Sequence, residues 1–405
     1  MRAHEATGAW PTFCVGHAGY DRRVPAISSK LPSGGISIFE VMSGLARQHQ
    51  AVNLSQGFPD FGTSPELIEL VAHYMREGYN QYAQMPGVPA LREALAGKIE
   101  LLYGRRYDPV TEIAITTGAT EALFASLTAV VRPGDEVVLF EPAYDSYLPA
   151  VRLSGGIPRF VTLRYPSYRI DWDDVRRAVG PKTRAVVINT PHNPTGMMWT
   201  ADDMRELSRV LAGTGAVVIS DEVYEHVRFD GHRHESVARY PDLAERALVI
   251  SSFGKTYHTT GWKVGYCAGP PALVKEVSGI RQWITFSVNG AVQMAYADAV
   301  TRNPRCDDVT SFYEGRRARF LELTAASRFR PLGCEGTYFQ LMDYSAITDE
   351  PDVEFAQRLV TEHGVAAIPV SPFTQATDST PPVLRFCFAK RDETLGRAAE
   401  RLLRV

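Results

Sequence analysis

The middle of this chain alternates short β-branched apolar runs with amphipathic helical patterns, and this alternation restricts the fold more than any other feature of the sequence. Five runs predict strands, at Ile113–Thr116, Val137–Phe140, Ala185–Asn189, Ala216–Ser220 and Ala247–Ser251. Such alternation is typical of parallel strands joined by helical crossovers. The runs are almost continuously apolar, as expected for a sheet covered on both faces. We therefore predict an α/β fold with a large, mostly parallel sheet covered by helices.

The pattern changes after about residue 300, where helices and strands no longer alternate regularly. The sequence there predicts helices at Phe312–Ala326, Val353–His363 and Glu393–Leu403, with the strand VLRFCFA before the last helix. This arrangement predicts a second, smaller α+β domain.

The chain length of 405 residues suits two or three domains at roughly 100–200 residues each. We predict an N-terminal extension at 1–30, a segment at 31–62 that packs on the small domain, a large domain at 63–305 and a small C-terminal domain at 306–405. Residues 31–62 contain Pro, Gly and polar residues and too little periodic structure to form a core of their own.

Composition excludes several classes of function. Lys and Arg number 43 against 46 Asp and Glu, without blocks of one sign, so nothing favours nucleic acid or an anionic membrane as a partner. No apolar stretch approaches the ~20 residues of a spanning helix, and the start lacks the layout of a secretory signal, so we expect a cytoplasmic protein.

The five cysteines have irregular spacings that favour reduced, structural residues. The segment FDGHRHES is typical of a turn, and no metal site is expected.

Polar residues follow the predicted strands. Ligands of open α/β sheets bind beyond the carboxyl ends of the strands, so these residues are candidates for a site. After the first strand, Gly118, Ala119 and Thr120 open a helix whose free N–H groups could bind phosphate, although this piece alone favours an ordinary strand-to-helix turn. Tyr144 follows the second strand as an aromatic face. Asn193 follows the third in a Pro-rich turn, where purely local hydrogen bonds are the alternative.

The last two strands are followed by ionisable side chains. Asp221 ends an apolar strand, where an unpaired carboxylate costs several kcal/mol, so it needs a cation nearby. Tyr224 comes three residues later and could face the same ligand. Ser252, Lys255 and Lys263 lie in the hydroxyl-rich loop after the fifth strand, where a surface lysine is the ordinary alternative.

These loops together suit one ligand. A P-loop is excluded because Val249 occupies the position of its first glycine, and no G-x-G-x-x-G motif follows a strand. Pyridoxal phosphate would use every group: its phosphate at the helix start, its ring on Tyr144, its nitrogen at Asp221 and its aldehyde at Lys255.

From Ile36 to the C-terminus, the sequence resembles the class I aminotransferases of the fold-type I pyridoxal-phosphate enzymes. The motifs that carry the resemblance fall in the order of the family: NLSQGFPDF, YNQYAQMPGVPALREAL, GATEALF, NTPHNPTG, SDEVYEH, SSFGKTYHTTGWKVGYC, EGTYFQL and RFCFAK. The sequence is most similar to the branch of the methionine aminotransferases, next to the kynurenine aminotransferases and glutamine transaminase K.

The resemblance implies roles for the cofactor-binding residues. Lys255 would form the Schiff base, Asp221 would pair with the ring nitrogen, and Asn193 and Tyr224 would bind the ring hydroxyl oxygen. Ser252, Lys263 and the backbone near Gly118, Ala119 and Thr120 would hold the phosphate. In this family Tyr82 reaches the phosphate of the neighbouring subunit, which implies a homodimer with shared active sites.

The resemblance also implies the substrates, an amino acid and a 2-oxo acid. Arg385 would clamp the α-carboxylate as a bidentate partner, although an edge-strand arginine is the alternative. Gly57 and Asn193 would contact the substrate, and Phe39, Tyr82 and Phe286 match apolar pocket positions. Methionine is the favoured donor, with aromatic amino acids, histidine, glutamine or kynurenine as further substrates.

Two other functions use the same sequence features. A cysteine-conjugate β-lyase would need the same Lys255. A non-enzymatic regulator would need a separate DNA-binding module, for which the 35 residues before Ile36 are too few.

Overall fold

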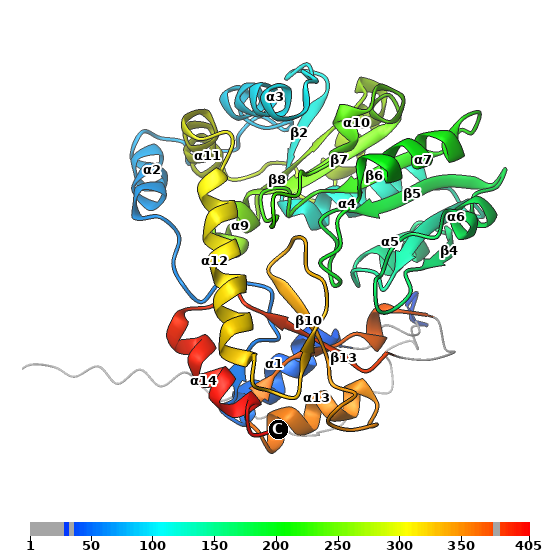
Figure 1. The fold of residues 1–405 in the computed structure, drawn as a ribbon. Helices are drawn as coiled ribbons and strands as arrows, with labels where there is room; N and C mark the ends of the chain where they lie inside the picture. The colour runs from blue at the N-terminus through cyan, green and yellow to red at the C-terminus, as the bar shows by residue number, and fades with distance from the viewer. Residues whose placement is uncertain (1–27, 32–35, 376–380) are drawn as a thin grey trace, which may run out of the picture.

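A computed structural model describes residues 28–31, 36–375 and 381–405 of the chain (Figure 1). A large sheet with its helices forms one part, and a smaller sheet with α13 and α14 forms the other. The predicted extension at 1–30 lies almost entirely outside the described residues, and so does Cys14.

The large sheet has seven strands in the order β2-β8-β7-β6-β5-β3-β4. Their bounds are β2 Ile113–Thr116, β3 Glu136–Glu141, β4 Ile157–Thr162, β5 Thr183–Asn189, β6 Val217–Asp221, β7 Ala247–Ser252 and β8 Gly265–Ala268. The pairs from β4 to β7 are parallel, whereas β8 pairs antiparallel with both β7 and β2. The predicted α/β fold is confirmed, and each of the five predicted strands is present.

Two strands of this sheet, β4 and β8, are absent from the sequence prediction. β4 is an edge strand whose residues are mostly exposed or half-buried, so it lacks the continuous apolar run of a central strand. β8 has four residues and includes a glycine. It can run antiparallel because it returns to β7 without a long crossover helix.

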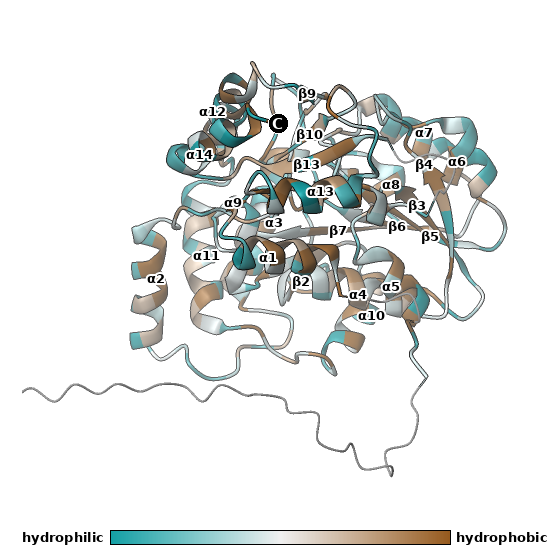
Figure 2. Cartoon of the chain, turned by 90° about the horizontal axis from the view of Figure 1, so that it is seen from below, coloured by the Kyte–Doolittle hydropathy of each residue, from teal (hydrophilic) through white to brown (hydrophobic). Residues whose placement is uncertain are grey.

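Helices cover both faces of the large sheet. Their bounds are α2 Pro65–Arg76, α3 Pro89–Tyr103, α4 Gly118–Val130, α5 Tyr147–Leu153, α6 Trp172–Ala178, α7 Ala201–Leu211, α8 Pro241–Ala244, α9 Phe253–Thr256, α10 Pro271–Arg281 and α11 Gly290–Arg302, with 3-10 turns η1 Val237–Arg239 and η2 Thr260–Trp262. One core joins α4, α5 and α10 to Leu139 and Val187. Another joins α3, α7 and α11 to Val138 and Val186. Neighbouring residues of each strand thus point to opposite faces of the sheet and enter different cores. Figure 2 shows the hydrophobic strands surrounded by helices that are partly polar.

The smaller part contains α12 Asp307–Thr324, β9 Arg330–Pro331, β10 Phe339–Asp343, α13 Asp352–Thr361, β11 Val365–Ala366, β12 Ile368–Pro369, η3 Ser371–Phe373, β13 Val383–Cys387 and α14 Asp392–Leu402. Its sheet is antiparallel, in the order β12-β13-β10-β9. The N-terminal helix α1 (Ile38–Gln48) packs on α13, and β1 (Val52–Asn53) pairs with β11. The smaller α+β part is confirmed, while the boundaries at residues 30, 62 and 305 stay predictions.

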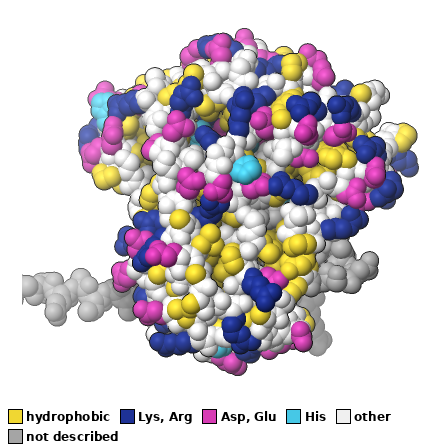
Figure 3. Space-filling view, viewed as in Figure 1, with side chains coloured by type: hydrophobic (Ala, Val, Ile, Leu, Met, Phe, Trp, Pro, Cys, Tyr) yellow, Lys and Arg dark blue, Asp and Glu magenta, His cyan; other side chains and the backbone are white. Residues whose placement is uncertain are grey.

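The cysteines and surface charges agree with a reduced, mixed-charge protein over the described residues. Cys267, Cys306, Cys334 and Cys387 are free and buried. Basic and acidic side chains are interspersed on the face in Figure 3. Across the described ranges, no helix has the length and apolar character required to span a membrane. The sequence predicts a solvated loop for the FDGHRHES segment, but its His234 is buried against Glu222, with 2.9 Å between the ring Nε2 and the carboxylate.

Candidate active site

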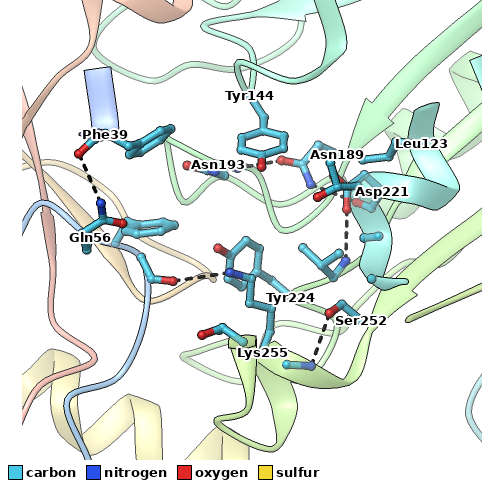
Figure 4. Close-up of a pocket in the computed structure, with 18 of the residues that line it drawn as sticks. Phe39, Gln56, Leu123, Tyr144, Asn189, Asn193, Asp221, Tyr224, Ser252 and Lys255 are labelled. Carbon is cyan, nitrogen blue, oxygen red and sulfur yellow. Dashed lines mark hydrogen bonds between the residues drawn. The ribbon is translucent and has the colours of Figure 1, made fainter. Parts of the chain in front are cut away.

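A cavity of about 260 Å³ lies at the carboxyl ends of the parallel strands, where the N-terminal segment and the smaller part meet the large sheet (Figure 4). It is lined by Phe39, Gln56, Gly57, Gly118, Ala119, Thr120, Leu123, Tyr144, Asn189, Asn193, Asp221, Val223, Tyr224, Ser252, Gly254, Lys255, Thr260, Lys263, Phe339 and Arg385. The adjacent strands β5, β6 and β7 end at Asn189, Asp221 and Ser252, so their last side chains enter one space.

The structure gathers most of the predicted site residues in this cavity. The two that it does not are Tyr82 and Phe286, whose rings contact each other at 5.5 Å and whose residues are 84% and 48% exposed. Their predicted contacts with cofactor and substrate therefore cannot be made within a single chain of this conformation.

Lys255 lies in α9, which Ser252 caps by accepting a hydrogen bond from the Gly254 N–H. The lysine Nζ donates to the Tyr338 hydroxyl at 3.1 Å and to the Gly57 carbonyl at 3.4 Å. Burial lowers the pKa of Lys255 to about 8, because desolvation disfavours the ammonium. A useful fraction of the amine is therefore unprotonated, and hence nucleophilic, near neutral pH.

Asp221 is buried, and it has no ion-pair partner within 4.0 Å among the residues that the structure describes. The cation expected in direct contact with it is therefore not supplied by these residues, although the Lys255 ammonium in the same cavity attracts it. Instead, its carboxylate accepts a hydrogen bond from the Tyr147 hydroxyl at 2.6 Å and one from the Val223 N–H at 3.3 Å. Burial raises the pKa of Asp221 to about 6. The cavity thus contains a carboxylate that a cationic ligand would stabilise.

Two asparagines connect the backbone of Asp221 to the opposite end of the cavity. Asn189 donates to the Asp221 carbonyl at 2.9 Å and accepts from the Asn193 N–H at 2.7 Å. The side-chain oxygen of Asn193 in turn accepts from Arg385 Nη1 at 2.7 Å. The turn asparagine therefore reaches across to another part of the chain, which the purely local alternative did not include.

Arg385 lies on β13, which has a strand on each side, so it is not an edge-strand residue. It is 1% exposed, and its guanidinium carbon is 3.8 Å from the centre of the Phe339 ring and 5.0 Å from that of Phe39. Nη2 donates to the Ser55 carbonyl at 3.1 Å, whereas Nε is buried and has no hydrogen-bond partner within the described ranges. Burial lowers its pKa, since no carboxylate pairs with it in the described residues. A bound carboxylate would compensate this cation.

The start of α4 forms the third charged region of the cavity. Gly118 has φ +71°, and a Cβ there would lie 3.4 Å from Lys263 Nζ. The free N–H groups of a helix start, together with a lysine ammonium, are suited to a phosphate.

Aromatic residues form the remaining walls. Tyr224 is 3% exposed and lies edge-on to Tyr338, with ring centres 5.1 Å apart. Burial raises the pKa of Tyr144 to about 12, so this phenol stays protonated.

The sequence prediction missed Tyr147, Asn189 and Tyr338. Tyr147 stands three residues after Tyr144, and Asn189 is the last residue of a predicted strand, so position alone could have indicated both. Tyr338 lies in the EGTYFQL motif, but its contact with Lys255 joins residues 83 positions apart.

The fold and these side chains define an enzyme site that combines a reactive amine, a buried carboxylate, a phosphate seat and a carboxylate clamp. The class I and II aminotransferase family matches residues 49–402 of the chain. A methionine aminotransferase of Escherichia coli (strain K12) is 51% identical over 376 residues, which cover 92% of this chain and 97% of that protein. A kynurenine–oxoglutarate transaminase of Dictyostelium discoideum is 34% identical over 419 residues, covering 93% and 96%.

Solved structures agree with these sequence relations. The crystal structure of E. coli YbdL, in which a methionine aminotransferase function was identified, has a TM-score of 0.91 at 50% identity and covers 94% of this chain and 100% of that chain. This chain belongs to the class I and II aminotransferases and is a transaminase. Its resemblance to the methionine and kynurenine aminotransferases is confirmed.

Proposed function

We propose that the cavity binds pyridoxal 5′-phosphate and that the enzyme transfers the α-amino group of methionine to a 2-oxo acid. The observation that carries this proposal is the buried carboxylate of Asp221, which has no ion-pair partner within 4.0 Å among the described residues and shares a cavity with the amine of Lys255. A protonated pyridine nitrogen supplies the missing cation, and an aldehyde is the natural partner of an amine with a lowered pKa.

The remaining lining residues fit the rest of this cofactor. Gly118, Ala119, Thr120, Ser252 and Lys263 would hold its phosphate, because they combine helix N–H groups, a hydroxyl and a cation. Asn193 and Tyr224 would bind its ring hydroxyl, and Tyr144 would cover its ring.

The chain's own residues prepare the substrate for reaction. When bound, pyridoxal phosphate supplies an electron sink that stabilises a carbanion at Cα. Arg385, oriented by Asn193 and the Ser55 carbonyl, would bind the α-carboxylate and so place Cα in the cavity. Lys255 Nζ would accept the α-proton as a positioned base.

The charges of the lining residues favour an uncharged side chain in the donor. The lysines and arginines that line the cavity are Lys255, Lys263 and Arg385. Each has a role in the scheme above, so the described part of the chain offers no further cation in the cavity for a side-chain carboxylate. Phe39 and Phe339 instead offer apolar contacts to a thioether or an aromatic ring. A relative that is 51% identical is a methionine aminotransferase, which supports methionine as the donor.

We also infer a homodimer in which Tyr82 and Phe286 complete the active site of the neighbouring subunit. Both are exposed on one chain and contact each other, and Trp283, three residues before Phe286, is 84% exposed. Exposed apolar residues grouped in this way are typical of an interface. Sedimentation velocity should give twice the chain mass of 44.8 kDa, and a single-chain mass would contradict the shared site. Action in the cytoplasm stays a prediction from the sequence.

The proposed function can be tested by the visible spectrum of the purified protein. Cofactor bound to Lys255 should colour the protein yellow, and methionine added alone should remove the colour faster than aspartate does. A 2-oxo acid should then restore it. A protein that takes up no cofactor, or whose colour no amino acid changes, would contradict the proposal. Pyruvate and ammonia released from a cysteine conjugate without an acceptor would instead indicate the β-lyase.

Arg385→Lys should raise the KM for methionine by about 100-fold and change kcat much less. Lysine keeps the charge but loses the planar fork that binds both carboxylate oxygens. Steady-state kinetics measure the two constants separately. Arg391→Lys, on an exposed residue, is the matched control. An unchanged KM in Arg385→Lys would remove Arg385 from the substrate site.

A further inference from the structure

The hydroxyl of Tyr338 lies between the reactive amine and a backbone carbonyl. It is 3.1 Å from Lys255 Nζ and 2.5 Å from the Gly57 oxygen, and Lys255 Nζ is itself 3.4 Å from that oxygen. Tyr338 is 0% exposed, so water does not compete for these contacts. Figure 4 shows the Lys255 amine and its bond to a backbone carbonyl at the edge of the cavity.

The directions of these hydrogen bonds follow from the atoms involved. A carbonyl oxygen can only accept, so the single proton of the Tyr338 hydroxyl is donated to Gly57. The lone pairs of the hydroxyl oxygen then face Lys255, which must donate to it. Burial raises the pKa of Tyr338 well above its usual value, so the phenol keeps the proton that this arrangement needs.

A neutral lysine amine has two N–H groups and one lone pair. The Tyr338 and Gly57 oxygens are 2.5 Å apart, so both lie on the same side of Nζ and accept from the amine there, which leaves the lone pair directed away from both of them. We propose that Tyr338 is a positioning residue, which together with the Gly57 carbonyl holds the free Lys255 amine with its lone pair directed into the cavity. The catalytic role of this positioning rests on the proposed function.

The Gly57 carbonyl is a fixed acceptor, because other residues hold the segment that carries it. Arg385 donates to the Ser55 carbonyl at 3.1 Å, and Lys390 donates to the Phe58 carbonyl at 2.7 Å. Gly57 itself has no room for a side chain, since a Cβ would lie 2.8 Å from Phe339 Cζ. The Gly57 carbonyl therefore stays in place when the Lys255 side chain moves. The amine can return to the same position each time it is released.

Tyr338→Phe tests the proposal, and Tyr313→Phe is a matched control. Tyr313 is also 0% exposed, its ring centre is 5.5 Å from that of Tyr338, and its hydroxyl has no hydrogen-bond partner among the described residues. Each variant thus removes one buried hydroxyl from the same core. Tyr338→Phe removes the contacts with Lys255, Gly57 and Tyr224, whereas Tyr313→Phe removes no hydrogen bond within the described residues. Thermal unfolding of both variants checks that the fold is kept.

The first measurement uses the cofactor-free protein and needs no transaminase activity. Acetylation of Lys255 by acetic anhydride is followed across pH by peptide mass spectrometry, and its midpoint reports the pKa of Lys255, about 8 in the wild type. Loss of an acceptor disfavours the ammonium, so Tyr338→Phe should lower the midpoint by about one pH unit. Tyr313→Phe should leave it unchanged. An upward shift of the midpoint in Tyr338→Phe would show that water enters the site, and an unchanged midpoint would show that the Tyr338 hydroxyl does not contact Lys255. Either result overturns the proposal.

The second measurement uses the cofactor-loaded protein and a single turnover with methionine. Tyr338→Phe should reduce the rate by about 10-fold or more, with little change in KM, because the base is less well directed. A larger isotope effect with α-deuterated methionine should accompany this loss. Equal rates in Tyr338→Phe and Tyr313→Phe would overturn the proposal. A wild-type protein without turnover would contradict the proposed function, while the labelling experiment would still test Tyr338.

Discussion

Lys255→Ala should reduce amino-group transfer by about 10⁴-fold or more. The variant loses both the amine that would bond the cofactor's aldehyde and the base that would accept the α-proton. No other amine that lines the cavity in the described residues can replace it in both tasks, because Lys263 lies at the helix start beside Gly118. Stopped-flow spectroscopy with methionine measures the loss directly. The visible colour of lysine-bound cofactor should disappear as well.

Lys275→Ala is the control for this variant, because Lys275 is exposed on α10 and does not line the cavity. It should keep the wild-type rate and colour. Turnover in Lys255→Ala close to that of Lys275→Ala would reject Lys255 as the reactive residue.

Asp221→Asn should lower turnover by about 10³-fold, because a neutral amide cannot keep a ring nitrogen protonated as a carboxylate can. The amide has nearly the size of the carboxylate and can still accept from Tyr147, which is 2.6 Å away in the wild type. The loss should therefore appear in the rate of α-proton removal rather than in the fold. A rate within a few-fold of the wild type would mean that Asp221 has another role.

The same substitution should stabilise the cofactor-free protein at neutral pH. The pKa of Asp221 is about 6 in the folded chain against an ordinary 3.8, so the folded state favours the protonated form. The free energy of unfolding therefore falls as pH rises from about 4 to about 6, and it stays lower above that range. The amide that replaces the carboxyl does not titrate, so the variant should be more stable than the wild type at pH 8 by up to about 3 kcal/mol.

Thermal or denaturant unfolding at pH 8 and pH 4 checks the sign of this effect. The advantage of Asp221→Asn should be much smaller at pH 4, where the wild-type carboxyl is protonated in the folded state and partly protonated in the unfolded one. Asp349→Asn, on an exposed residue, should change stability little at either pH. Lower stability of Asp221→Asn at pH 8 would show that the buried charge is compensated in the free protein.

Five of the seven strands of the large sheet and most of the site could be predicted from the sequence, for a local reason. A strand buried on both faces must be almost entirely apolar, and its end is marked by the first polar residues, such as Asp221 after Ser220. Parallel strands then bring these ends to one edge of the sheet. The positions of Asn193, Asp221 and Lys255 in the cavity follow from that rule.

The contacts that connect these residues could not be predicted in the same way. Tyr147 reaches Asp221 over 74 positions, and Asn193 receives Arg385 over 192. Neither pairing leaves a periodic pattern, because each depends on how two separately formed elements pack. The edge strand β4 was missed for a related reason: its exposure permits polar residues and so removes the apolar run.

Sequence alone determined which chemical groups this transaminase has and on which strand ends they stand, since burial restricts residue type locally. Tertiary structure alone decided what those groups can do. Packing removes water from Lys255 and lowers its pKa, leaves Asp221 without a direct ion-pair partner among the described residues, and orients Arg385 through Asn193. Desolvation and hydrogen-bond direction depend on neighbours from distant parts of the chain, which only the folded protein brings together.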